Sequence, residues 1–591
     1  MDVRRAETLT RGVSHWRRSC VGLAAAAALA FPSISWAQQE PVPGSSPEAK
    51  AGTQAGAATI QAAPGETAGN LSKSRAIRIA RTDAKYAAQR RKYGRLNPSA
   101  QAKPGLWQID FYAGGVDRVQ VVVDDATGTV RESWTGYQIA WPMARGYPGQ
   151  FGHTLNSPYV WGLMAALFFF GLLDWRRPWR AVHLDLLVLL SFGISEAFFN
   201  AAQIGVSVPL AYPPLVYLLA RMLWVGFRGL GAGLRPSVPI TALVVLTAFL
   251  VGFRVALNIA DSGVIDVGLA GAIGADHLVH GQAIWNNFPT DNPYGDTYGP
   301  FNYLAYVPFD LVLPWSGHWD EVPAAHAAAI LFDLAAIAGL FVLGRRLRPA
   351  RAGTDLGIVL AFAWAAYPFT DYALQSNSND GLVAALLIWS LVAFSSPLKR
   401  GVLLALAAAT KFAPLALAPL FVGGERGLAT RPRAIRPALA FSGSLIAVIG
   451  VMLALPAVDP GLATFYDRTI KSQLDRSSPF SIWGQDGSLE WVQTVVKAFA
   501  VGLAVLVAFV PRRRSLYQVG ALAAAVTIAV QLTAEHWFYL YVPWFFGLVL
   551  CTLAGSDEPS TREPIASAPG AFRYSDEGAG KGLASSSIKG G

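Results

Sequence analysis

The sequence predicts an all-α polytopic membrane protein that carries a small exported α+β domain. Of its 591 residues, 53% are hydrophobic and only 15% are charged, whereas a soluble protein carries roughly a quarter charged residues. Apolar runs long enough to cross a hydrocarbon core of ~30 Å recur along the chain. Lys and Arg cluster beside these runs, as at 174–180 and 344–351, and such clusters are typical of cytoplasmic loops.

The net charge of +10 therefore reflects membrane topology, and we expect no nucleic-acid partner. The sequence contains only two cysteines, Cys20 and Cys551, which lie at opposite ends of the chain. A disulfide framework or a Cys/His zinc site needs more cysteines than this. We expect neither disulfides nor a bound metal.

The N-terminus has the pattern of a secretory signal peptide over residues 1–37. Five arginines precede a short apolar run at 21–31, and the small residues Ser35 and Ala37 follow it. We expect cleavage after Ala37, with an uncleaved anchor as the alternative. The Pro/Ala/Gly-rich stretch 38–72 and the Ser/Gly-rich tail 555–591 are expected to be disordered.

Residues 73–150 are predicted to form the exported domain. A helix-like run at 72–92 is followed by alternating apolar residues at 106–114 and by two strand-like runs within 116–136, joined around Asp124–Gly128. A helix with a three-stranded antiparallel meander and a "v.vd..tG.v" turn resembles the PepSY-type domain. The resemblance implies an exported interaction or regulatory module; a simple cap on the membrane domain is the alternative.

The membrane domain is predicted to extend over residues 157–554 with about eleven spans. With the N-terminal domain outside, the basic clusters fall in the cytoplasm, and an odd number of crossings leaves the C-terminal tail inside. The expected spans are 157–173, 182–199, 206–225, 237–258, 323–343, 355–373, 380–395, 437–457, 490–510, 516–534 and 537–554.

The apolar run 401–424 is expected to be a re-entrant helical pair. Basic residues flank it on both sides, so both of its ends favour the cytoplasm. Lys411 and Pro414 lie at its centre, which predicts two half-helices that meet at a break. Irregular backbone at membrane depth is tolerated where it lines a protein cavity.

The long polar loop 258–319 is predicted to lie on the outer side and to contain the reactive carboxylate. Charged residues at the mouth of a membrane bundle are costly and are usually functional. If the protein transfers a group from a lipid to a hydroxyl acceptor, a carboxylate near the membrane surface must take the proton of that hydroxyl. Asp266 and Asp261 are suitably placed for this role. The alternative is that they cap a short helix, an explanation that suits Asp261 better than Asp266.

Several short motifs in a fixed order resemble the GT-C glycosyltransferases, most closely glycosyltransferase family 87. They are Asp266–Leu269 with Gly281–Trp285, then Asp296–Pro300, Asn377–Gly381 and Thr410–Pro414. Together these motifs extend over about 250–425. Leu269 and Trp285 depart from the pattern, because Tyr is common at both positions in the family.

The resemblance implies a membrane enzyme of the bacterial plasma membrane that uses a polyprenyl-phosphate sugar as donor. It implies an inverting, metal-independent hexosyl- or pentosyltransferase without cofactor, such as a mannosyltransferase, acting on a glycolipid, polysaccharide or protein. Asp266 is the position that matches the family's catalytic base, and Asp261 is the second candidate.

The departing phosphate requires cationic partners, and the donor requires polar and aromatic contacts. Attraction to anionic lipid headgroups explains each outer arginine equally well, and interfacial anchoring explains the aromatic residues around His536. The predicted substrate-binding residues are Asp296, Tyr298, Asn379, Asp380, Lys411, Arg468, Arg476 and His536.

Two other functions fit parts of the pattern. A transporter or flippase of lipid-linked sugars would suit the intramembrane charges and the break at Lys411. A sensor or scaffold would make the N-terminal domain the working part and the helices its anchor. The polar residues gather in outer loops and no inverted repeat is visible, so the sequence favours the glycosyltransferase.

Overall fold

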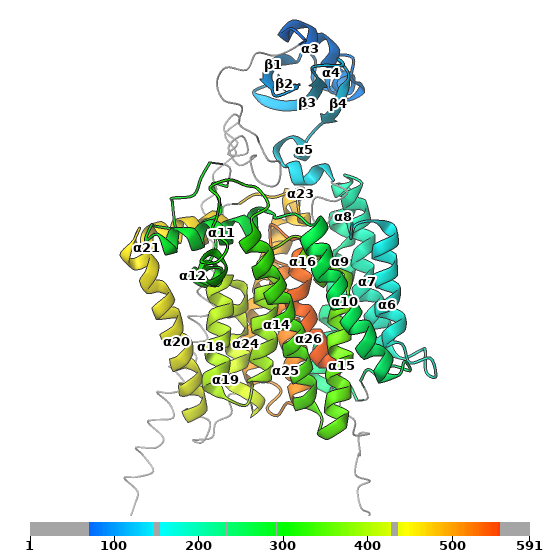
Figure 1. Ribbon diagram of the computed structural model, residues 1–591, viewed down its shortest axis with the longest axis vertical. Coiled ribbons are helices and arrows are strands. Elements are labelled where there is room, and N and C mark those ends of the chain that lie inside the picture. The colour runs from blue at the N-terminus through cyan, green and yellow to red at the C-terminus, as the bar shows by residue number, and fades with distance from the viewer. Residues whose placement is uncertain are drawn as a thin grey trace, which may run out of the picture.

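The computed structural model describes residues 70–146, 154–231, 233–290, 292–426, 435–474 and 476–555. Within these residues a small domain stands above one end of a helical bundle (Figure 1). We call this the domain-facing end of the bundle. The expected signal peptide, most of the expected linker and nearly all of the C-terminal tail lie outside the described residues.

The small domain consists of two helices packed on a four-stranded antiparallel sheet with the strand order β1-β2-β3-β4. Its inner face buries Ile109, Phe111, Val119, Val121 and Val123 completely. The elements are α3 (Lys73–Ala80), α4 (Ala84–Tyr93), β1 (Asn97–Lys103), β2 (Leu106–Ala113), β3 (Val116–Asp124) and β4 (Val130–Trp134).

The sequence predicts three of these four strands and the turn between the last two. Asp124 accepts hydrogen bonds from the backbone N–H groups of Ala126 and Thr127, at 3.0 and 2.8 Å, and Gly128 has a φ of +67°. The additional strand, β1, has no alternating apolar residues and is almost wholly exposed. Its pairing with β2, and not its own pattern, makes it a strand.

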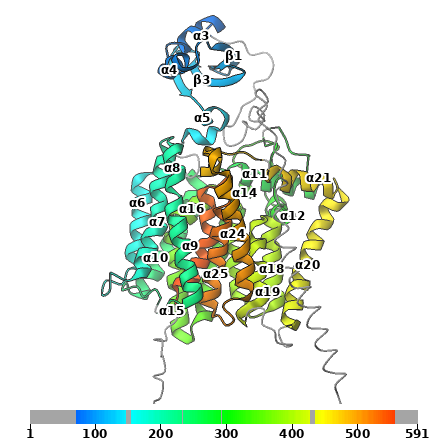
Figure 2. The same cartoon turned by 180° about the vertical axis from the view of Figure 1, so that it is seen from behind.

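The longer helices of the bundle lie side by side, and shorter ones pack among them (Figures 1 and 2). They are α6 (Pro158–Leu172), α7 (Ala181–Asn200), α8 (Ile204–Leu210), α9 (Tyr212–Arg228), α10 (Ile240–Asp261), α14 (Pro323–Leu347), α15 (Ala350–Ala366), α16 (Pro368–Gln375), α17 (Asp380–Val392), α18 (Pro397–Thr410), α19 (Ala418–Gly423), α20 (Ile435–Val458), α24 (Glu490–Phe509), α25 (Leu516–Gln531) and α26 (Val542–Leu553).

The structure supports fewer complete spans than the eleven expected. Within the described residues, six helices are long and apolar enough to cross a membrane, and α15 with α16, which meet at a 59° bend, gives up to seven. Four other expected spans correspond to the shorter helices α6, α17, α25 and α26. Almost every residue of α25 and α26 is buried, so their apolar sequences reflect the protein core and do not by themselves indicate a lipid crossing.

The expected break at Lys411 is present. Helix α18 ends at Thr410, Lys411 is extended, and a 3₁₀ turn η2 (Ala413–Leu417) leads into α19. Gly424 follows α19, and a Cβ placed on it would lie 3.1 Å from a guanidinium nitrogen of Arg400, near the start of α18. The segment therefore returns to the level from which it began, with Lys411 at its turning point.

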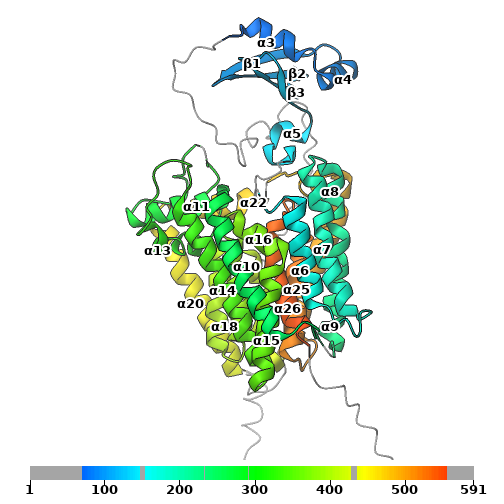
Figure 3. The ribbon, with the colours of Figure 1, turned by 45° about the vertical axis from the view of Figure 1, so that its right-hand side comes forward.

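Short helices cover the domain-facing end of the bundle (Figure 3). They are α11 (Asp266–Val279), α12 (Pro300–Leu304), α13 (Val307–Asp310), α21 (Leu462–Tyr466), the π-helical turn η5 (Asp467–Lys471), α22 (Ser472–Leu474), α23 (Ile482–Gln485) and the 3₁₀ turns η6 (Gly487–Leu489) and η7 (Tyr539–Tyr541). The connector from the small domain, α5 (Tyr137–Ala140) with η1 (Pro142–Arg145), ends on the same side.

Candidate functional site

The centre of the site is a buried ion pair between Asp380 and Lys411. Asp380 begins α17 and Lys411 lies at the break after α18, so two interrupted helices bring the charges together. Lys411 Nζ lies 2.6 Å from Asp380 Oδ1, and the Trp544 indole N–H donates to the same oxygen at 2.9 Å. The two charged side chains are only 12% and 1% exposed, and at such burial each charge needs the other.

Aromatic rings surround the Lys411 ammonium. Its nitrogen lies 5.6 Å from the ring centroid of Tyr298, 5.4 Å from that of Tyr541 and 5.2 Å from that of Trp544. A cation within about 6 Å of an aromatic face is attracted by the ring quadrupole. Lys411 is therefore held inside the protein, and Tyr298 lies beside it.

Asp266 lies at the N-terminus of α11, next to this pair. A Cβ on Gly268 would lie 2.2 Å from the carbonyl oxygen of Asn377, so only a glycine lets the start of α11 approach the segment that leads into α17. Burial raises the pKa of Asp266, as does the charge of Asp380, while Arg476 and Lys411 lower it. The structure thus gathers Asp266, Asp380, Lys411 and Arg476 in one electrostatic environment.

His536 borders this cluster between α25 and η7. Its Nδ1 lies 2.9 Å from the hydroxyl of Ser478, and its ring packs against Phe480 at 5.3 Å between centroids. Burial lowers the pKa of His536 well below its usual range, and the cations Arg476 and Lys411 lower it further. A neutral imidazole at this position can make hydrogen bonds but carries no charge for a phosphate.

Arg468 and Asp296 are directed at each other. Arg468 Nε and Nη2 lie 2.6 and 2.7 Å from the two carboxylate oxygens of Asp296, and Nη2 also donates to the Pro293 carbonyl. Asp296 further accepts the backbone N–H of Asn286 at 2.7 Å. This bidentate pair fastens the polar loop to η5. Binding of substrate by Asp296 and Arg468 stays a prediction.

Asn379 and Asp261 have separate surroundings. Asn379 is fully buried and donates to the side-chain oxygen of Asn302 at 2.6 Å. Asp261 is the last residue of α10 and accepts a hydrogen bond from the Thr154 hydroxyl. Of the two carboxylates expected to act as base, Asp266 is therefore the one placed with Lys411 and Arg476.

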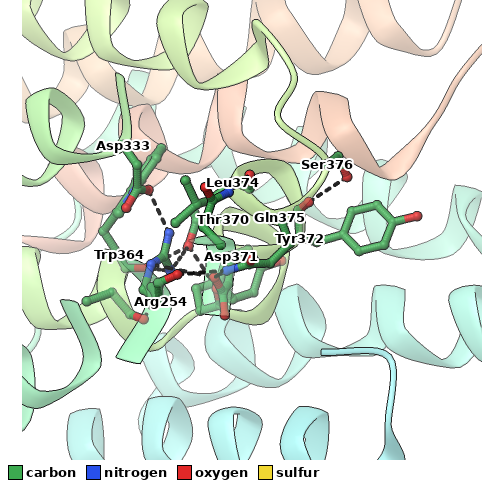
Figure 4. Close-up of polar contacts among 12 residues, drawn as sticks. Arg254, Asp333, Trp364, Thr370, Asp371, Tyr372, Leu374, Gln375 and Ser376 are labelled. Carbon is green, nitrogen blue, oxygen red and sulfur yellow. Dashed lines mark hydrogen bonds and ion pairs between the residues drawn. The ribbon is translucent and has the colours of Figure 1, made fainter. Parts of the chain in front are cut away.

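A buried network beneath the site was not anticipated from the sequence. Arg254, in the middle of α10, is wholly buried and its Nη2 lies 2.6 Å from Asp333 of α14 (Figure 4). It donates to Thr370 at 3.1 Å and lies 3.8 Å from Asp371 of α16, to which Gln375 donates at 2.8 Å. A charge inside an apolar run is the signal that points to such a network, because it requires a partner.

The network continues into the segment that carries Asp380. The Asn258 amide donates to the Leu374 carbonyl at 2.9 Å and to the Asn377 side chain at 2.8 Å. Asn377 in turn donates to the Gly263 carbonyl at 3.0 Å. Buried polar bonds therefore fix the end of α16, the end of α10 and the start of α17 relative to each other, which positions Asp266 and Asp380.

This arrangement supplies a basic carboxylate and two cations at one end of an apolar bundle. A carboxylate with a raised pKa is suited to accept a proton, and the neighbouring cations are suited to an anionic group. Among the described residues no three His, Cys, Asp or Glu side chains are grouped as a metal site would require.

The family model of glycosyltransferase family 87 matches residues 297–543 of the chain. The matched stretch contains Tyr298, Asp380, Lys411, Arg476 and His536, and it begins after Asp266 and after the small domain. The match supports a membrane glycosyltransferase. No curated protein and no solved structure matches the chain, and the PepSY resemblance of the small domain stays an expectation.

Proposed function

We propose that the protein transfers a sugar from a polyprenyl-phosphate donor to an acceptor hydroxyl on the outer face of a bacterial plasma membrane. The observation that carries the proposal is the position of Asp266, a carboxylate of raised pKa beside Arg476 and Lys411. This cluster lies at the domain-facing end of the bundle, in a chain stretch that largely coincides with the family match. The acceptor is a glycolipid, a polysaccharide or a protein.

Asp266 is assigned the role of general base. Its carboxylate takes the proton of the acceptor hydroxyl while the hydroxyl oxygen attacks the anomeric carbon of the donor. The bond from that carbon to the phosphate oxygen breaks, and the phosphate leaves with the electron pair. A single displacement of this kind inverts the anomeric configuration, and none of its proton transfers requires a metal.

Arg476 and Lys411 are assigned to the phosphate. The Arg476 guanidinium presents a planar fork suited to phosphate oxygens. The Lys411 ammonium has three N–H donors, of which one is directed at Asp380, so two can point to a substrate anion. In this assignment Asp380 and the surrounding rings hold the ammonium in place and the substrate uses its remaining donors.

The test is a transfer assay on the full-length protein in lipid nanodiscs. The donors are radiolabelled undecaprenyl-phosphate mannose and arabinose, and a total lipid extract supplies the acceptor. Asp266→Asn keeps the size of the side chain and removes its basicity, so we expect transfer to fall about 10²- to 10⁴-fold.

Asp276→Asn is the matched control, because Asp276 lies on the same helix α11 and is associated with His280. This control is expected to keep the transfer rate of the wild type. Full transfer by Asp266→Asn would remove Asp266 as base and leave Asp261 as the remaining candidate. Transfer that EDTA abolishes would contradict the metal-independent mechanism.

A further inference from the structure

The connector between the small domain and the bundle reaches the proposed site. Helix α5 and the turn η1 lie between the sheet and the domain-facing end of the bundle (Figures 1 and 3). Trp141 separates these two elements and is only 7% exposed. A large aromatic side chain is thus buried at the junction between the two parts of the protein.

Trp141 contacts three residues on the site side of this junction. The Arg476 guanidinium lies 5.4 Å from its ring centroid. Phe480 meets its ring edge-on at 5.7 Å, and His536 lies at 6.1 Å between centroids. Two of these three residues, Arg476 and His536, belong to the proposed site.

The connector is tied to both parts of the protein. On the bundle side, Gln138 donates to the Ala202 carbonyl at 2.9 Å and Tyr137 donates to the Gln485 carbonyl at 3.3 Å. On the domain side, Arg145 donates at 2.6 Å to Gln120 of β3 and at 2.8 Å to the Gln138 carbonyl. The connector that carries Trp141 is therefore fixed to the bundle and linked to the small domain.

Arg476 is oriented by this ring more than by hydrogen bonds. Its Nε is buried and has no hydrogen-bond partner within the described part of the chain. Stacking on an aromatic face leaves the N–H groups at the edge of the guanidinium available for an anion. A guanidinium held in this way is pre-organised for a phosphate, because its side chain loses little freedom on binding.

We propose that Trp141 is a positioning residue that holds Arg476 at the donor phosphate, so that the docked small domain completes the site. The inference rests on the proposed function. It gives a residue outside the family match, which begins at residue 297, a role in donor binding that acts through Arg476. Undocking of the small domain would then weaken binding of the donor without any change in the base Asp266.

The test compares Trp141→Ala, Trp141→Phe and Trp179→Ala in the full-length protein in nanodiscs. Trp141→Ala is expected to raise the KM for the undecaprenyl-phosphate sugar about fivefold, or about 1 kcal/mol, with little change in kcat. Trp141→Phe retains an aromatic face and should restore most of the affinity. Trp179→Ala removes a tryptophan that is 97% exposed and lies outside the connector, and it serves as the matched control.

A second comparison separates positioning of Arg476 from general loosening. In an Arg476→Gln background, Trp141→Ala should raise the KM no further, because the residue through which it acts is already absent. Additive increases in KM would overturn the inference, as would a Trp141→Ala enzyme whose donor KM equals that of Trp179→Ala. In either case transfer by the wild type keeps the proposed function intact.

Hydrogen exchange gives a readout that does not depend on activity. Trp141→Ala is expected to speed exchange in peptides covering 476–486, and Trp179→Ala is expected to leave it near the wild-type rate. If Trp141→Ala leaves the exchange rate of these peptides unchanged, Trp141 does not hold the segment 476–486 in place. A wild type that transfers no sugar would overturn the proposed function, and the donor role of Trp141 with it.

Discussion

The Asp380–Lys411 pair offers a quantitative test of the site's construction. Lys411→Met removes the ammonium and leaves a carboxylate that is 1% exposed. Among the described residues, the Trp544 N–H is then the one side-chain donor directed at it. Asp380→Asn removes the negative charge and retains an oxygen that can accept from Trp544. The double variant removes both charges from the same buried place.

The structure sets the expected size of each effect. Removing one partner of a buried pair costs about 3–5 kcal/mol, because the other charge stays buried without compensation. Asp380→Asn should be near the lower end, since the three rings around the ammonium still attract it. Lys411→Met should be near the upper end. The double variant leaves no buried charge and should cost only about 1–3 kcal/mol.

The assay is SDS titration of the purified protein in detergent micelles, followed by far-UV circular dichroism. Lys399→Met is the control, because Lys399 is exposed on the same helix α18 and should change stability by less than about 0.5 kcal/mol. If the two charges stabilise each other, the stability loss of the double variant should be at least about 2 kcal/mol smaller than the summed losses of the two single variants. Losses that simply add would show that the two charges do not stabilise each other.

Two further predictions concern other charged residues. Arg254→Met leaves Asp333 and Asp371 buried without their cation and should cost about 3–5 kcal/mol of stability in the same titration. Adding Asp333→Asn should recover part of this loss. An equal loss in the double variant would contradict the prediction. Burial and the charge of Asp110 raise the pKa of Asp117 from 3.8 to about 7. The folded small domain therefore favours the protonated acid. It loses stability as the pH rises from about 4 to 7. Asp117→Asn should therefore stabilise the domain at pH 8 by about 2 kcal/mol, roughly half of the full pKa effect because the side chain is partly exposed, and should change little at pH 4. Hydrogen exchange of the β2–β3 hairpin, compared with wild type at each pH, measures this, and an equal gain at both pH values would refute it.

The local features of the site were predictable because each depends on a short stretch of sequence. Lys411 and Pro414 in an apolar run indicated a break, and the chain does break and return there. One local expectation differed: helix capping suited Asp261 better than Asp266, yet Asp266 begins α11 and Asp261 ends α10. Asp124 and Gly128 indicated a tight turn, and the turn is formed by the hydrogen bonds those residues favour.

The pairing of the charges was not predictable in the same way. Arg468 was expected to bind phosphate, yet it lies against Asp296, 172 residues away in the chain. Arg254 was not singled out, although its partners Asp333 and Asp371 complete a buried network. Any outer arginine has several carboxylates within the same loops as possible partners, and only the packing of the helices determines which of them it reaches.

The sequence by itself determined the class of this protein, the position of its breaks and turns, and the kinds of residue in its site. Those properties follow from hydropathy, charge and backbone preference, which act over a few residues at a time. Only the tertiary structure decided which cations stay available, how many helices are long enough to span, and that Trp141 of the connector reaches Arg476. Ion pairing and burial depend on the distances between elements remote in the chain, and the folded packing alone sets those distances.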